Sequence, residues 1–464
     1  MKERNIVTLL VTFFVLVSLL LTYYLLYDVS SFCALINHES AEEISNQEIL
    51  QKTAGQDYYQ PTQLTFDDTL KIQGIFFSEG GQVYQAKGKD FEAAWAKFAQ
   101  TVKLDVVSDS IVKGTDQYYS LFDGDYLEID YGTPLPLETY DSLISDMHHY
   151  ESFQFDQLLV PVNEGRDVYL ANSQTHEYLE ASFSRQAKKE SCLALIEDHR
   201  EDLLEVTRYL GGHGYNYLPI QSQQLATQYY VLESIPENIY VSQMFADGSD
   251  FSIPDSDGNT NVYKNFQYTL EVNRDQQRLD YMINRIAKGD QVPLSQQLKN
   301  SFKNFSQYEY WQGDLRLVNY QHGVLTYRRY LNDLPIYSPV GQVDYGASIV
   351  HLRNDGSGEM YRYQSPLLDF YAHIQDRSRM VDLESGQTIY DTLNQYGYQI
   401  EAFDHIQLAY EWQKDMDDFK RVELIPKWFF EFDGKMYSLD DIQSDSFDQI
   451  YQAKINDRVE EGQE

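Results

Sequence analysis

The sequence is poor in cysteine and in positive charge. Its 464 residues include two cysteines, Cys33 and Cys192, and only 36 lysines and arginines against 72 aspartates and glutamates. Two cysteines are too few for a disulfide framework or for a zinc site with four cysteine ligands. A formal net charge of −36 argues against nucleic acid as a partner and against a polybasic contact with anionic lipids, because both carry negative charge.

The sequence also lacks the spacings by which common enzymes and cofactor sites are recognised. It contains no H-E-x-x-H, no G-x-S-x-G, no Walker loop and no G-x-G-x-x-G. His148 and His149 are adjacent, and neighbouring side chains diverge on a helix or a strand, so a surface role is favoured over metal binding. Residues 255–260 (DSDGNT) resemble a calcium loop, but Lys264 occupies the position of the bidentate glutamate. We therefore predict no enzyme, no metal site and no cofactor.

An uncharged apolar run, IVTLLVTFFVLVSLLLTYYLLY, occupies residues 6–27. As a helix, these 22 residues would be about 33 Å long, enough to cross a hydrocarbon layer of about 30 Å. A signal peptide has a shorter apolar core, of about 7–15 residues, and then a small-residue cleavage site, and no clear A-x-A pattern follows here. The run predicts a retained membrane anchor at residues 1–27, with a cleaved signal as the alternative.

The flanks of the apolar run predict its direction. Lys2 and Arg4 precede it, and the first basic residue after it is Lys52. The positive-inside rule then places the N-terminus in the cytoplasm and everything after about Asp28 outside. We expect a single-pass protein of the cell membrane with a short cytoplasmic stub and an extracellular C-terminal portion.

Four hydroxyl residues in the run share one face of the expected helix. At 100° per residue, Thr8, Thr12, Ser18 and Thr22 fall within an arc of about 120°. Such a face suits close packing against another membrane helix, and we take these four residues as the candidate partner contact. The alternative is that each hydroxyl bonds the preceding turn of its own helix and contacts no partner.

The rest of the chain predicts an α+β fold of antiparallel sheets with packed helices. Asp-Gly pairs between apolar runs are a strong hairpin signal, and they occur at residues 123–124, 355–356 and 433–434. The segment FQYTLEVNRDQQRLDYM, residues 266–282, alternates apolar and polar residues, turns and returns, as a strand pair does. Helices expected between these hairpins cover residues 91–102, 137–147, 188–212, 293–305 and 387–397.

Composition and spacing also predict the domain organisation. We expect three extracellular α+β domains after the anchor, since the length suits two to four domains. The expected boundaries are 1–27 for the transmembrane anchor, 28–60 for a juxtamembrane linker, 61–190 for an N-terminal domain, 191–300 for a middle domain, 301–450 for a C-terminal domain and 451–464 for a disordered acidic tail.

Several segments, in this order along the chain, resemble the YycH (WalH) family. They are the anchor ending SLLLTYYLLY, then YLEIDYGTPLPLETYDSLI, YNYLPI, YVSQMFADGSDF, FQYTLEVNRDQQRLDYM, YWQGDLRLVNY, LTYRRYLNDLPIYS, EMYRYQSPLLDF and LIPKWFFEFDGKMYSL. The related YycI family has a similar closing element but is much shorter, so the length favours YycH.

The resemblance implies a function that the residues alone do not give. YycH proteins resemble three-domain α+β ectodomains that act with YycI and alter signalling by the YycG/WalK sensor histidine kinase, partly through transmembrane helices. The family offers no catalytic motif to carry over. We therefore expect a non-enzymatic accessory regulator of a two-component system, embedded in the membrane, with a sensor histidine kinase and a YycI-like protein as partners. The alternative is an anchored extracellular enzyme acting on the cell wall, or a wall-binding module.

Overall fold

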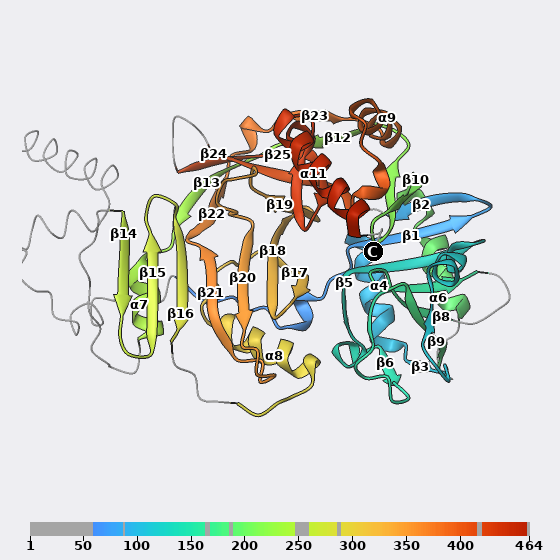
Figure 1. The fold of residues 1–464 in the computed structure, drawn as a ribbon, viewed down its shortest axis with the longest axis horizontal. Coiled ribbons are helices and arrows are strands. Elements are labelled where there is room, and N and C mark those ends of the chain that lie inside the picture. The colour runs from blue at the N-terminus through green and yellow to red at the C-terminus, as the bar shows by residue number, and fades with distance from the viewer. Residues whose placement is uncertain are drawn as a thin grey trace, which may run out of the picture. The chain divides into compact units, whose positions relative to one another are not determined.

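The structure, a computed structural model, describes residues 59–86, 89–162, 168–184, 189–245, 259–284, 289–414 and 420–461. Two large sheets and a two-stranded ribbon dominate them, and short helices pack on the sheets (Figure 1). Among the described strands two pairings are parallel, β3 with β6 and β19 with β24, and the others are antiparallel. The expected α+β class with antiparallel sheets is therefore confirmed.

The first sheet has eleven strands in the order β11-β10-β2-β1-β5-β7-β8-β9-β3-β6, with β4 paired to β9. Its longest member, β5, is buried along most of its length, which explains its run of apolar residues. The strands are β1 (Gly74–Glu79), β2 (Gln82–Ala86), β3 (Leu104–Val106), β4 (Val112–Lys113), β5 (Tyr126–Pro136), β6 (Ile144–Asp146), β7 (Gln154–Pro161), β8 (Val168–Asn172), β9 (Glu177–Phe183), β10 (Leu203–Gly211) and β11 (Gly214–Pro219).

The second sheet has thirteen strands in the order β14-β15-β16-β21-β20-β18-β19-β24-β25-β13-β22, with β17 on β18 and β26 on β25. The ribbon pairs β12 (Gln223–Ala226) with β23 (Met380–Leu383). The strands of the second sheet are β13 (Gln228–Ser234), β14 (Thr260–Lys264), β15 (Tyr268–Asn273), β16 (Arg278–Ile283), β17 (Asp314–Gln321), β18 (Val324–Leu331), β19 (Leu334–Tyr337), β20 (Ala347–Leu352), β21 (Met360–Pro366), β22 (Leu368–His373), β24 (His405–Lys414), β25 (Arg421–Phe432) and β26 (Lys435–Ser438).

The described helices are short. The α-helices are α4 (Lys89–Thr101), α5 (Thr115–Tyr119), α6 (Lys189–Asp198), α7 (Glu237–Met244), α8 (Leu294–Phe305), α9 (Gly386–Tyr396), α10 (Leu439–Ile442) and α11 (Asp445–Glu461). The 3₁₀ turns are η1 (Asp67–Thr69), η2 (Ser120–Phe122), η3 (Leu137–Tyr140), η4 (Arg200–Asp202), η5 (Gln375–Arg377) and η6 (Ile400–Ala402). One hydrophobic cluster includes residues of α4, α6, α7 and α8 together with residues of both large sheets.

Three of the five expected helices are confirmed, because their apolar residues recur on one face. In α4 the side chains of Phe91 and Trp95 are buried at helical spacing, and the buried Val102 directly follows the helix, which begins at Lys89. Helix α8 follows Pro293. Helix α9 has a serine N-cap, Ser385, and a left-handed glycine, Gly397, at its end.

Two expected helices are wrong in part. Residues 137–147 form η3 and β6, because the backbone of this segment pairs with the sheet: the Leu104 N–H donates to the Leu143 carbonyl at 2.9 Å. The helix expected at residues 188–212 ends at Asp198, and β10 follows. In β10 the buried Val206 lies between Val83 of β2 and Pro219 of β11, and this pairing decides the conformation.

The hairpin signals have mixed outcomes. The pairs at residues 355–356 and 433–434 connect β20 with β21 and β25 with β26, and the segment 266–282 contains β15 and β16, as expected. The pair at residues 123–124 is not a turn between two strands, because η2 precedes it. The buried Phe122 packs there against Tyr118 and Tyr126, which favours the helical turn.

The expectation of a disordered tail at residues 451–464 is wrong up to Glu461, where α11 ends. Tyr451 is only 4% exposed, and its hydroxyl accepts a hydrogen bond from the Gln399 N–H at 2.9 Å. The ring of Tyr451 also lies 4.6 Å from the ring of Tyr398. An aromatic anchor therefore attaches this acidic helix to the core around α9.

The predicted domain boundaries remain predictions. Strands β10 and β11 follow the boundary expected near residue 190 and belong to the first sheet. The predicted anchor at residues 1–27 and most of the linker at 28–60 lie outside the described residues. From residue 59 onward, no described helix has the combination of length and apolar character that a membrane span requires.

Candidate functional site

The candidate contact residues named from the sequence, Thr8, Thr12, Ser18 and Thr22, lie outside the described residues, and so does Cys33. Cys192 and the pair His148 and His149 lie within the described residues. Cys192 is fully buried on α6, as expected of a core thiol, and burial raises its pKa to about 12. The exposed His148 and His149 form the centre of a surface turn, which the Tyr150 N–H closes by donating to the Met147 carbonyl.

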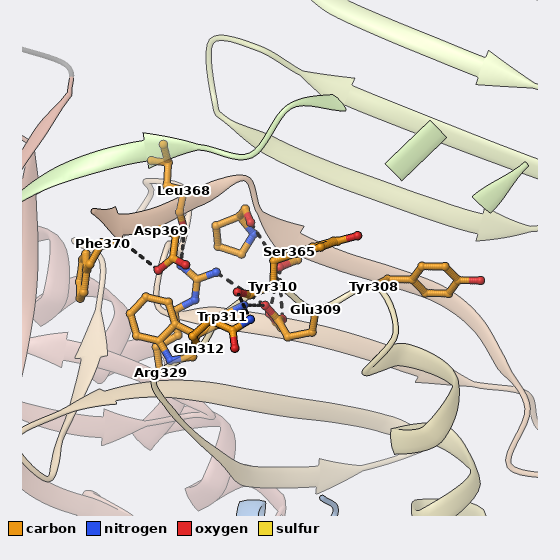
Figure 2. Close-up of polar contacts among 12 residues, drawn as sticks. Tyr308, Glu309, Tyr310, Trp311, Gln312, Arg329, Ser365, Leu368, Asp369 and Phe370 are labelled. Carbon is orange, nitrogen blue, oxygen red and sulfur yellow. Dashed lines mark hydrogen bonds and ion pairs between the residues drawn. The ribbon is translucent and has the colours of Figure 1, made fainter. Parts of the chain in front are cut away.

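A buried arginine lies at the centre of the second sheet. Arg329 of β18 is 0% exposed, and its guanidinium lies 4.4 Å above the Trp311 ring. Its Nη1 donates to the Leu368 carbonyl at 2.7 Å, while Nε and Nη2 have no hydrogen-bond acceptor. Figure 2 shows this guanidinium between the Leu368–Asp369 backbone and the carboxylate of Glu309.

Glu309 is the counter-charge of this arginine. It lies between α8 and β17, is 1% exposed, and has its Oε1 3.9 Å from Arg329 Nη2. Its carboxylate accepts hydrogen bonds from the Trp311 N–H at 3.0 Å, from the Tyr363 hydroxyl at 3.1 Å and from Ser348 Oγ at 2.5 Å. The Glu309 carboxylate therefore links the segment before β17 to β20 and β21 (Figure 2).

Asp369 adds a second carboxylate beside the arginine. Burial raises the pKa of Asp369, and the nearby Arg329 opposes that rise. Hence one cation and two carboxylates share this part of the core. Because Glu309 and Arg329 are buried almost completely, the cluster cannot receive a substrate, and its geometry is that of a structural network.

The first sheet contains a second buried polar cluster, centred on Glu128 of β5. Glu128 is 1% exposed and accepts hydrogen bonds from Gln157 Nε2, at 3.0 Å, and from the Tyr217 hydroxyl. Burial, and next the charge of Asp130, raise the pKa of Glu128 to about 8. The Glu128 side chain is therefore largely protonated at neutral pH.

Asp156 of β7 is the other deeply buried carboxylate of this cluster. It is 3% exposed, and burial raises its pKa to about 6, although hydrogen bonds from the Ser173 hydroxyl and N–H oppose the rise. The neighbouring Asp130 is partly exposed, and its pKa is raised by burial and by Asp156. Perturbed carboxylates often mark active sites, but Glu128 and Asp156 have no access to a substrate.

Arg208 of β10 is the cation that opposes the rise in the pKa of Glu128. Its Nη1 donates to the Tyr126 hydroxyl and to the Phe122 carbonyl, both at 3.1 Å, and its guanidinium lies 4.4 Å above the Tyr215 ring. Tyr217 of β11 thus bonds Glu128 directly, and Arg208 contacts Tyr126 and Tyr215 beside it. Across the described ranges, no three His, Cys, Asp or Glu side chains are grouped so that they could hold a metal ion.

Sequence reasoning missed both clusters, although each has a signal. In LTYRRYL two consecutive arginines lie on one strand, so alternation turns at least one of them toward the interior, and in the structure both Arg328 and Arg329 are buried. Glu128 lies between Leu127 and Ile129 in a strand that is buried on both faces. A charge within an apolar run indicates a buried network, but its partners come from distant segments that no local pattern identifies.

Two family models match the chain. The model described as the N-terminal domain of YycH protein matches residues 4–191, and the model of its C-terminal domain matches residues 214–446. No curated protein matches.

Two solved structures are similar to this one. The crystal structure of YycH from Bacillus subtilis has 18% sequence identity and a TM-score of 0.64, and the match covers 82% of this chain and 98% of that one. At this identity the likeness shows the fold alone. An uncharacterized protein from Eubacterium rectale has 11% identity and a TM-score of 0.31, with 48% of this chain and 85% of that one covered, which is too low to carry an argument.

Proposed function

The chain belongs to the YycH family, and on that premise we propose that it modulates a membrane sensor histidine kinase of the YycG/WalK type together with a YycI-like partner. Membership itself implies a regulatory role in the YycG/WalK system, in a family of accessory proteins that is not known for enzymatic activity. The observation that carries the proposal is the match of both YycH domain models, in order, over most of the chain.

The proposed location is the cell membrane, with a cytoplasmic N-terminus and an extracellular C-terminal portion. The uncharged run at residues 6–27 supports an anchor, and Lys2 and Arg4 on its N-terminal side support this direction. In this arrangement residues 6–27 lie in the membrane and the residues after about Asp28 lie outside, so the proposed contacts with the kinase are in the membrane and on the extracellular side.

Control of the kinase requires that this protein binds one signalling state better than the other. A difference in binding free energy of about 1–3 kcal/mol gives a shift of about 5–150-fold in the equilibrium, which is the usual range of allosteric coupling. The proposed source of that difference is helix packing at Thr8, Thr12, Ser18 and Thr22, because small hydroxyl residues allow membrane helices to approach closely.

The test replaces side chains on one face of the proposed anchor at a time, in the full-length chain. One variant replaces the four hydroxyl residues by leucine, and a control variant replaces Phe13 and Leu20, on the opposite face, by isoleucine. We expect the first variant to lose co-purification with the kinase and to change kinase autophosphorylation, and the control to do neither. If replacing the whole run by an unrelated apolar helix leaves association and kinase output unchanged, the helix-contact proposal is wrong.

The alternative of a wall-acting enzyme lacks a supporting observation among the described residues. A glycoside-cleaving site needs two carboxyl groups that reach the substrate. Glu128 and Asp156 have the perturbed pKa values that such chemistry uses, but they are 1% and 3% exposed. The accessory role is therefore the function that we propose.

A further inference from the structure

A hollow of about 500 Å³ opens at one end of the second sheet, away from both buried clusters. The β17–β18 hairpin and the segment between β20 and β21 form it. Its lining residues are His322, Leu352, Arg353, Asn354, Asp355 and Tyr361. The volume lies within the range of small-molecule sites, about 300–1,000 Å³.

Two irregularities of the backbone direct side chains toward this hollow. His351 pairs with Arg362 and Leu352 with Met360, so Tyr361 is the extra residue of a β-bulge, and it is 37% exposed. Bulges re-aim side chains and are common beside functional sites. On the other side, His322 has a φ of 50° and Gly323 a φ of 78°, as in the tight two-residue hairpins that glycine permits.

The loop after β20 holds its polar groups in fixed positions. The Asp355 carboxylate accepts hydrogen bonds from the Ser357 N–H at 3.1 Å and from Ser357 Oγ at 2.5 Å. These bonds lower the pKa of Asp355, which keeps it ionised. Its Oδ2 lies 3.1 Å from Arg353 Nη2, and the Arg353 N–H donates to the Glu359 carbonyl at 3.0 Å.

The same loop is anchored to α8. Gly358 has a φ of 74°, and a Cβ at this position would overlap the backbone of Gln297 in α8. The Gly356 carbonyl accepts a hydrogen bond from the Val292 N–H at 2.9 Å. The Leu352 N–H donates to the Gly323 carbonyl at 2.7 Å, which joins this loop to the β17–β18 hairpin. The walls of the hollow are therefore preorganised, and binding a ligand orders few groups.

The chemistry of the lining selects a class of ligand. Arg353 and Asp355 are paired, so their charges cancel, and the chain as a whole carries −36, which disfavours an anion. An exposed aromatic ring offers a flat apolar face, while carboxylate, amide, guanidinium and imidazole groups hydrogen-bond to neighbouring hydroxyls. We propose that this hollow binds a neutral saccharide unit, with its ring on Tyr361 and its hydroxyls on the exposed side chains of Asn354 and His322.

This binding site goes beyond the proposed regulatory function and does not depend on it. Tyr361 supplies the stacking surface, and the exposed His322 and Asn354 supply the polar contacts, while Asp355 holds the loop in place. Leu352 contributes an apolar wall. The site thus has the composition of a recognition site, an apolar platform with a few convergent polar groups.

The test titrates the full-length protein with two neutral oligosaccharides, N,N′,N″-triacetylchitotriose and maltotriose, by isothermal calorimetry. A polyoxyethylene detergent is used, because alkyl glycoside detergents carry a sugar headgroup. We expect at least one oligosaccharide to bind with a Kd in the millimolar range or below, and the two probes distinguish an amino sugar from a plain hexose. Failure of both to bind at millimolar concentration overturns the proposal.

Two variants locate the binding. Tyr361→Ala and Asn354→Ala are each expected to weaken binding by about tenfold, through loss of stacking and of a hydrogen bond. The matched control is Tyr371→Ala, since Tyr371 of β22 is a tyrosine with 63% exposure outside the hollow, and this change should leave binding intact. Equal affinity of wild type and both hollow variants overturns the proposal, and Asn354→Ala decides the question if Tyr361→Ala does not fold.

Discussion

Replacing Glu309 by glutamine tests the buried network of the second sheet. The change keeps the shape of the side chain and removes the negative charge that lies 3.9 Å from Arg329 Nη2. Two unit charges at that distance interact by about 4 kcal/mol at an effective dielectric constant of about 20. Removing one partner of a buried pair typically costs about 3–5 kcal/mol, because it leaves the other charge uncompensated. Since Asp369 still faces Arg329, we expect a loss of about 3 kcal/mol in the free energy of unfolding.

The double variant Glu309→Gln/Arg329→Met sharpens this prediction. It removes both charges and also the two guanidinium donors, Nε and Nη2, that have no acceptor. We therefore expect the double variant to be more stable than Glu309→Gln alone, as found when buried pairs are replaced by apolar side chains. Tyr363→Phe is the control within the same network, because it removes a hydroxyl that donates to Glu309 at 3.1 Å and to the Tyr308 carbonyl at 3.4 Å, without a change of charge, and it should cost about 1 kcal/mol.

The assay is urea unfolding of the full-length protein in detergent. Tryptophan fluorescence reports on the site directly, because Trp311 stacks on Arg329. Two results would refute the reasoning. One is a Glu309→Gln variant whose stability equals that of the Tyr363→Phe control. The other is a double variant whose loss of stability equals or exceeds the sum of the losses of the Glu309→Gln and Arg329→Met single variants. The two side chains would then have no favourable coupling energy.

Three further predictions use the same unfolding assay or a labelling experiment. The folded-state pKa values of Glu128 and Asp156, about 8 and about 6, lie above the ordinary 4.5 and 3.8, so the folded state binds more protons in this window. The free energy of unfolding should therefore fall as pH rises from about 4 to about 8, and Glu128→Gln should flatten the upper part of that slope; an unchanged slope would contradict the burial argument. Gly358→Ala should cost about 3 kcal/mol or more through backbone overlap, whereas Gly341→Ala, whose φ is also positive but whose surroundings are open, should cost about 1 kcal/mol. In a Cys33→Ser background, a cysteine placed at the exposed Met380 should react with a membrane-impermeant maleimide on intact cells, and reaction only after lysis would reverse the proposed orientation.

Much of the fold could be predicted from the sequence where one local pattern had no competitor. Helices α8 and α9 follow from helical spacing of apolar residues and from their start and stop residues. The hairpins at 355–356 and 433–434 follow from glycine in a tight turn. The hairpin at His322–Gly323 uses the same geometry but was not predicted, because histidine stands where aspartate or asparagine is usual.

The remaining features could not be predicted because tertiary pairing decides them. The segment after Asp198 is expected from the sequence to continue the preceding helix, yet its pairing with β2 and β11 makes it a strand. The partners of Glu309 are Ser348 and Tyr363, 39 and 54 residues away in the chain. When hydrogen-bond partners are this far apart in the sequence, the local sequence indicates the network only through a charged residue in a buried strand.

The pairing of β10 with β2 determines which pieces of this protein are self-sufficient. A fragment that ends at residue 191, where the first family match ends, contains β2 but not the strand that covers its edge from Val83 to Ala86. An uncovered edge is a template for pairing with other chains, so such a fragment is prone to aggregate. The same dependence applies during synthesis, because the edge of β2 stays open until β10, which ends at Gly211, has been made. The part of the chain up to residue 191 thus completes its sheet only with the strand that follows it.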